Sequence, residues 1–149
     1  MQAYSPVRAS TPDAQAPTPE NPLEISVLFT ERPLALAALD RAGAFAQRLT
    51  PAIRLIAVHA VPYPLEFGCP ASAHAHLVEQ LVEIASHSRF PVHAEVVLAR
   101  SREEGFRAGL PRDSTVLLAS RRRPWRTPEE KLGAMLSAQG HQVALFYME

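Results

Sequence analysis

The sequence has one cysteine and no surplus of charge of either sign. Cys69 has no partner in the chain for a disulfide, which fits a reducing compartment. Lys and Arg together number 15, the same as Asp and Glu, and this balance argues against a general affinity for nucleic acid or anionic lipid. No apolar run approaches the roughly 20 residues of a membrane-spanning helix, and residues 1–6 lack the basic and apolar order of a signal peptide. The sequence therefore predicts a cytoplasmic protein that partners neither a membrane nor nucleic acid.

Large apolar side chains are also scarce in residues 1–22. This segment contains Pro6, Pro12, Pro17, Pro19 and Pro22 among Ala, Ser, Thr and Gln. Such a composition buries too little surface to offset the entropy of ordering the chain. We expect a disordered leader over residues 1–22 and one folded domain over residues 23–149, which is long enough to form a sizeable core.

The rest of the chain alternates short apolar runs with amphipathic helix patterns. Apolar runs of this length, separated by helices, are typical of parallel strands that are buried on both faces. The alternation predicts a doubly wound, Rossmann-like α/β domain with helices on both faces of a five-stranded parallel sheet. The expected strands are residues 23–30, 53–61, 92–99, 115–119 and 143–147, and the expected helices are residues 33–49, 72–88, 102–110 and 128–139.

The expected strand at residues 92–99 differs from the others, because its apolar residues alternate with His93 and Glu95. Alternation is typical of a strand with one exposed face. We therefore expect this strand at an edge of the sheet.

Two helix starts carry capping boxes, formed by Ser101 with Glu104 and by Thr127 with Glu130. In this motif the hydroxyl accepts a hydrogen bond from the amide three residues later, and the carboxylate of that later residue reaches back. The boxes predict where the third and fourth helices begin.

An arginine-rich loop follows the fourth expected strand. In parallel sheets ligands bind at the carboxyl ends of strands. Guanidinium groups, together with the amino terminus of the next helix, can hold an anion such as a nucleotide phosphate. The alternative is a solvated basic loop in which Trp125 packs over the sheet end or the first helix, and stacking of Trp125 on a base stays open as well. The loop residues concerned are Ser120, Arg121, Arg122, Arg123 and Arg126.

No other group of residues predicts catalysis or a metal site. His74 and His76 are two residues apart in an expected helix and so point apart, without a thiolate cluster nearby. His59 is interpreted as a strand-end or core residue, and Cys69 as a loop residue. The chain has no Gly-x-Ser-x-Gly turn for a hydrolase triad. We expect a binding protein and not an enzyme, with nucleotide hydrolysis as the remaining alternative.

The order of the elements, the long loop after the second strand and the fourth strand running into Ser120-Arg121 resemble the universal stress protein family. The resemblance covers residues 23–149. It implies a sheet order of 3-2-1-4-5, a regulatory role in the stress response, and ATP or another adenine nucleotide as the candidate ligand.

The resemblance also implies a set of ligand contacts. Members that bind ATP carry an acid after the first strand, where this chain has Thr30 and Glu31. Their phosphate loop needs glycine, because backbone amides must approach phosphate closely, but the matching positions here are Ala119 and Arg122. The sequence therefore indicates that ATP binding of the family type is lost or rebuilt with side chains. Val58 on the second strand and Gly133, near the later Gly-Ser pair of the family, complete the implied contacts.

The last expected strand is apolar and lies at the other sheet edge. An uncovered apolar edge invites pairing with another chain. The resemblance implies a homodimer through Val143, Leu145 and Tyr147, because similar family members pair through this strand. A second interpretation is therefore a ligand-free homodimeric docking domain that has lost nucleotide binding and uses the loop at residues 62–70 as a further contact surface.

Overall fold

The computed structural model describes residues 7–10, 24–49, 52–63, 65–66 and 71–148. The described strands form one sheet in the order β1-β4-β3-β2-β5-β6. All neighbouring pairs among β2 to β6 are parallel, and only β1 pairs antiparallel, with β4. The parallel part has the predicted 3-2-1-4-5 order, so the α/β fold is confirmed. The strands are β1 (Val7–Ser10), β2 (Glu24–Phe29), β3 (Ala52–Ala60), β4 (Val92–Ala99), β5 (Thr115–Arg121) and β6 (Gln142–Met148), and the helices are α1 (Arg32–Leu49), α2 (Ala71–Ser86), α3 (Arg102–Gly109) and α4 (Pro128–Ala138).

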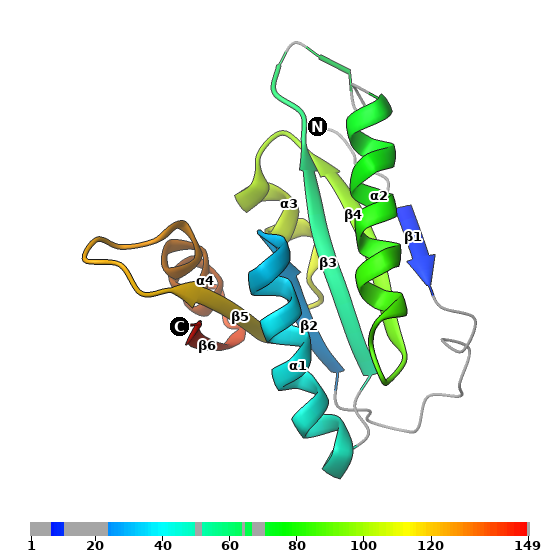
Figure 1. Cartoon of the computed structure of the whole chain (residues 1–149). Helices are drawn as coiled ribbons and strands as arrows, with labels where there is room; N and C mark the ends of the chain where they lie inside the picture. The colour runs from blue at the N-terminus through cyan, green and yellow to red at the C-terminus, as the bar shows by residue number, and fades with distance from the viewer. Residues whose placement is uncertain (1–6, 11–23, 50–51, 64, 67–70, 149) are drawn as a thin grey trace.

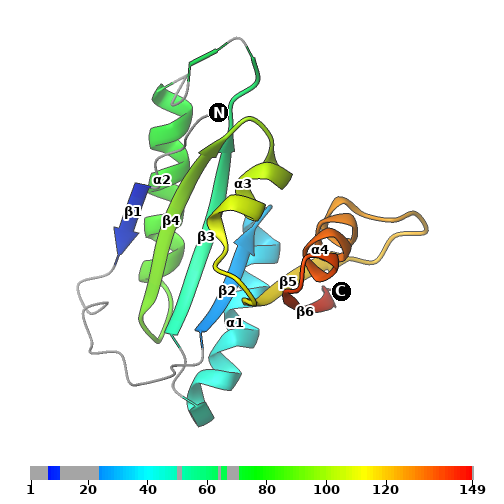
Figure 2. The same ribbon diagram turned by 180° about the vertical axis from the view of Figure 1, so that it is seen from behind.

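The sheet separates two core layers. Helices α1 and α2 cover one face, and α3 and α4 cover the other (Figures 1 and 2). Side chains alternate between faces along a strand, so Val27 packs in the layer under α1 and α2 while its neighbour Leu28 packs in the layer under α3 and α4. Both side chains are almost completely buried, as continuous apolar strands predict. No helix among the described residues has the length and apolar character needed to span a bilayer.

The edge position predicted for the strand at Val92–Ala99 is wrong. Strand β4 lies between β1 and β3, and both of its faces are largely buried. Glu95 is 4% exposed, because Arg54 on β3 reaches across and its Nη2 donates to Glu95 Oε1 at 2.6 Å. The polar residue that suggests an exposed face in the sequence is therefore a buried ion-pair partner.

The strand that covers β4 comes from the segment in which the composition predicts disorder. Residues Val7–Ser10 form β1 and pair with residues 93–96 of β4. This pairing uses main-chain groups, so it leaves no apolar pattern in the sequence for β1. The remaining residues of the predicted leader lie outside the described part of the chain.

Strands β2 and β5 stop pairing before they reach their carboxyl ends. They pair only between Ile25–Val27 and Thr115–Leu117, although β2 continues to Phe29 and β5 continues to Arg121. Figure 1 shows β5 leaving β2 at a steep angle, with the loop after β5 projecting to one side. Strand order reverses between these two strands, and such a switch point is where open α/β sheets bind ligands.

Candidate functional site

The corner after β2 and the arginine loop after β5 meet at this switch point. Nη2 of Arg121 donates to Oε1 of Glu31 at 2.5 Å. The two side chains are 35% and 50% exposed, so this is a surface ion pair that contributes about 1 kcal/mol or less to stability. Its value is geometric, since it joins two segments that are 90 residues apart.

Thr30 lies beside Glu31 at the same corner. Its hydroxyl oxygen Oγ1 is buried and has no hydrogen-bond partner among the described residues. Buried hydroxyl groups are normally bonded to protein or ordered water. The end of β2 therefore offers a polar group with hydrogen-bonding capacity to spare.

The arginine side chains line a hollow at the ends of β5 and β6. Its volume is about 310 Å³, and Arg121, Arg122, Arg123 and Met148 form its walls. The guanidinium of Arg122 lies 5.0 Å from the ring centroid of Tyr147, a cation–π distance. Arg123 is exposed. Because Arg121 is balanced by Glu31, the net positive charge of the hollow comes from Arg122 and Arg123.

Buried hydroxyl groups hold the two ends of the loop together. Oγ of Ser120 and Oγ1 of Thr127 are 2.7 Å apart. Thr127 Oγ1 also accepts the Glu130 amide at 3.1 Å, and the Thr127 amide donates to Glu130 Oε1 at 2.7 Å, so the predicted capping box of α4 is confirmed. At the other predicted box, Ser101 accepts the Glu104 amide.

The capping box places the carboxylate of Glu130 at the amino terminus of α4. The Tyr147 hydroxyl donates to Glu130 Oε2 at 2.6 Å. This bond and the Thr127 amide keep the pKa of Glu130 below its ordinary value, and the same bond raises the pKa of Tyr147. Glu130 is therefore ionised at neutral pH, and it repels an anion at the end of α4. The help that the sequence analysis expects from the helix terminus in holding an anion is therefore offset by this carboxylate.

Trp125 is 63% exposed, so the packing expected for it over the sheet or the first helix is not found. It stands in the loop that projects from the body of the molecule in Figures 1 and 2. Arg126 beside it is also exposed. An exposed indole next to an arginine is free to stack on an aromatic ligand.

Two residues of the implied ligand set pack beneath helices. Val58 on β3 lies directly under Gly105 of α3, where an added Cβ on the glycine would come within 2.5 Å of a Val58 methyl carbon. Gly133 lies on the buried face of α4 against Leu118 and Val143. The structure thus brings together Thr30, Glu31, Arg121, Arg122 and Arg123. Arg126 does not line the hollow, and Val58 and Gly133 serve the contact between helices and sheet.

A contact between two histidines that the sequence analysis does not predict lies at the end of β3. Nδ1 of His59 and Nδ1 of His74 are 3.2 Å apart. Burial, and secondly the charge of His74, lower the pKa of His59. The sequence places His59 near the end of a strand and His74 in the first turn of the next helix, but it carries no pattern that predicts the contact between their rings.

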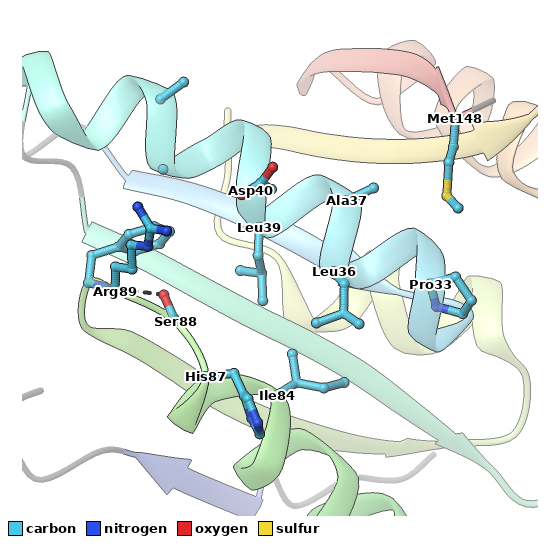
Figure 3. Close-up of a pocket in the computed structure, with 13 residues that line it drawn as sticks. Pro33, Leu36, Ala37, Leu39, Asp40, Ile84, His87, Ser88, Arg89 and Met148 are labelled. Carbon is cyan, nitrogen blue, oxygen red and sulfur yellow. Dashed lines mark hydrogen bonds between the residues drawn. The ribbon is translucent and has the colours of Figure 1, made fainter.

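A second, larger hollow lies between α1 and α2 (Figure 3), with a volume of about 940 Å³. Leu36, Leu39, Ile84 and Phe90 contribute apolar walls, and Asp40 and Arg89 lie at its rim. None of the sequence-predicted site residues lines it. Cys69 lies outside the described residues.

No protein-family model matches the chain, and no curated protein matches it either. The resemblance to universal stress proteins therefore rests on the order of the elements and on the loop after β5.

Proposed function

We propose that this chain is a universal stress protein-like regulatory binding module that holds the phosphate of an adenine nucleotide at the carboxyl ends of β2 and β5. The observation that carries the proposal is the hollow lined by Arg121, Arg122 and Arg123. Guanidinium groups bind phosphate oxygens through paired, charge-assisted hydrogen bonds. They replace the glycine-lined backbone cradle that Ala119 and Arg122 cannot provide.

The surroundings of the hollow suit a nucleotide. The exposed Trp125 offers a face on which a base can stack. Glu31 either accepts a hydrogen bond from a ribose hydroxyl or neutralises Arg121. These two roles of Glu31 make opposite predictions for its removal.

Phosphate, ADP and ATP are each expected to raise the melting temperature of the protein, because a ligand that binds only the folded state stabilises it. Arg123→Ala is expected to weaken the binding of phosphate, ADP and ATP by roughly tenfold each, about 1.4 kcal/mol, through the loss of a charge-assisted hydrogen bond. Isothermal titration calorimetry at fixed ionic strength would measure these affinities. Since Trp125 is the only tryptophan, its fluorescence should be quenched by ATP and not by inorganic phosphate.

Arg112→Ala is the matched control, because Arg112 is an exposed arginine in the turn before β5, at the opposite end of that strand. It should leave all three affinities unchanged, and equal losses in the two variants would show only unspecific attraction of anions. Glu31→Gln should strengthen phosphate binding by releasing Arg121, and it should weaken ATP binding if Glu31 contacts the ribose. Failure of millimolar phosphate, ADP and ATP to shift the melting temperature would refute the proposal.

A second candidate function is a homodimeric docking domain, and the exposed edge of β6 favours it. Strand β6 is outermost in the described sheet. Its residues Val143, Leu145 and Tyr147 point to one face, and Phe146 points to the other, where Arg41 lies 4.3 Å from its ring centroid. An apolar outer strand is a template for pairing with a second copy of the chain.

Ala144→Asp tests the dimer, because Ala144 is an exposed residue of β6 whose replacement places a charge on each side of a paired edge. Light scattering at high concentration is expected to give a dimer for the wild type and a monomer for this variant. Ala134→Asp, at an exposed position of α4, should remain a dimer. A wild-type protein that is monomeric at high concentration would rule out this function.

A further inference from the structure

His59 and His74 come from different elements, and their side chains meet at the carboxyl end of β3. His59 is the penultimate residue of β3 and is 8% exposed, whereas His74 lies in the first turn of α2 and is partly exposed. Their ring centroids are 5.3 Å apart, but their Nδ1 atoms are only 3.2 Å apart. The rings therefore turn their Nδ1 edges toward each other. Since β2 lies between β3 and β5, this pair forms a place distinct from the arginine hollow.

We propose that this imidazole pair binds a divalent transition-metal cation, with Zn²⁺ as the occupant that fits its geometry. Zinc–nitrogen bonds of about 2.0–2.1 Å in a tetrahedral arrangement place two ligand nitrogens about 3.3–3.4 Å apart. The observed separation of 3.2 Å agrees with this value within the roughly 0.2 Å expected of a ligand site. Imidazole nitrogen suits Zn²⁺, Cu²⁺ and Ni²⁺, whereas Mg²⁺ and Ca²⁺ require oxygen ligands.

The two histidines supply only part of a coordination shell. In the ranges that the structure describes, no three His, Cys, Asp or Glu side chains converge. The metal would therefore keep two tetrahedral positions for water or for an oxygen or nitrogen atom of a ligand. Zinc sites that bind or polarise a ligand keep three protein ligands and one open position, and structural zinc sites use four protein ligands, so the histidine pair supplies one ligand fewer than the former. The pair thus gives the carboxyl end of β3 a means of attracting an anion that does not depend on Arg121 to Arg126.

Zinc titration of the full chain tests the proposal. Every protein in the series carries Cys69→Ser, which removes the only thiol of the chain and with it any binding through sulfur. Zn²⁺ is expected to raise the melting temperature of this protein. His59→Gln and His74→Gln should each weaken Zn²⁺ binding by roughly tenfold or more. His76→Gln is the matched control, because His76 is exposed two residues further along the same helix, and it should leave the affinity unchanged.

A second measurement needs no substitution at the buried His59. Cu²⁺ bound to the same Cys69→Ser protein is expected to give an electron paramagnetic resonance spectrum with nitrogen couplings from two imidazoles, since Cu²⁺ generally exceeds Zn²⁺ in affinity for nitrogen ligands. Equal Zn²⁺ affinity in His74→Gln and His76→Gln, or no Zn²⁺ binding at all, would overturn the proposal. The contact would then be a hydrogen bond between two neutral rings.

Discussion

Phe106→Ala is expected to lower the free energy of unfolding by about 3–5 kcal/mol. Phe106 is completely buried in the layer under α3 and α4, where it shares a cluster with Leu28, Ile56 and Leu118. Its truncation removes apolar contacts and leaves a cavity that the surrounding residues fill only in part. Helix α3 has eight residues, fewer than an isolated helix needs for stability in water, so it depends on this anchor.

Urea unfolding followed by circular dichroism measures the effect. An unchanged dependence of the unfolding free energy on urea concentration shows that the substitution has not altered the compactness of the folded or the unfolded state. Trp125→Ala is the matched control, because it also truncates an aromatic side chain, but one that is 63% exposed. Its effect should stay within about 0.5 kcal/mol. Similar losses for the two variants would mean that α3 does not hold its face of the sheet.

The fold could be predicted because each element carries its own periodic signal. The apolar run Leu55–Val58 in β3 and the three- and four-residue spacing of Leu81, Ile84 and Ala85 in α2 each indicate one type of structure. Strands that alternate with helices leave few possible topologies, since crossovers between parallel strands are right-handed. The observed sheet order is one of the few that these constraints leave.

The position of β4 inside the sheet, next to β1, could not be predicted from the sequence of β4. The residues that bury β4 lie in other segments of the chain. Glu95 looks solvent-exposed in an alternating run, but the parallel register places Arg54 of β3 opposite His93, next to the carboxylate of Glu95. Burial of a charge is tolerated when a partner of opposite sign is bonded to it. Sequence periodicity contains no information about that partner, and β1 has no periodicity of its own.

The candidate site was predictable to the extent that topology determines it. Parallel strands place their carboxyl ends at one edge of the sheet, so the meeting of Glu31 and Arg121 follows from strand order alone. The exposure of Trp125 and the pairing of His59 with His74 depend on side-chain directions in loops and at helix starts. Neither has a repeating pattern that sequence analysis could use.

The arginine loop is held at its ends and exposed in its middle. Ser120 and Thr127 join its two ends through their hydroxyl groups, and Arg121 is held by Glu31. Arg123 and Trp125 between them are exposed. Fixed ends reduce the conformational freedom that a bound anion would otherwise have to remove, so the anchor should contribute to affinity as well as to stability.

Thr127→Val is therefore expected to destabilise the protein by about 2 kcal/mol and to weaken phosphate binding. Valine keeps the shape of threonine but removes Oγ1, which accepts the Glu130 amide and bonds to Ser120. Thr127 is 3% exposed, so water does not readily replace these bonds. Urea unfolding measures the stability, and hydrogen exchange of the Glu130 amide should become faster. Thr127→Ser keeps the hydroxyl and should lose less than about 1 kcal/mol; a valine variant as stable as the serine variant would show that the hydroxyl anchor does not stabilise the protein.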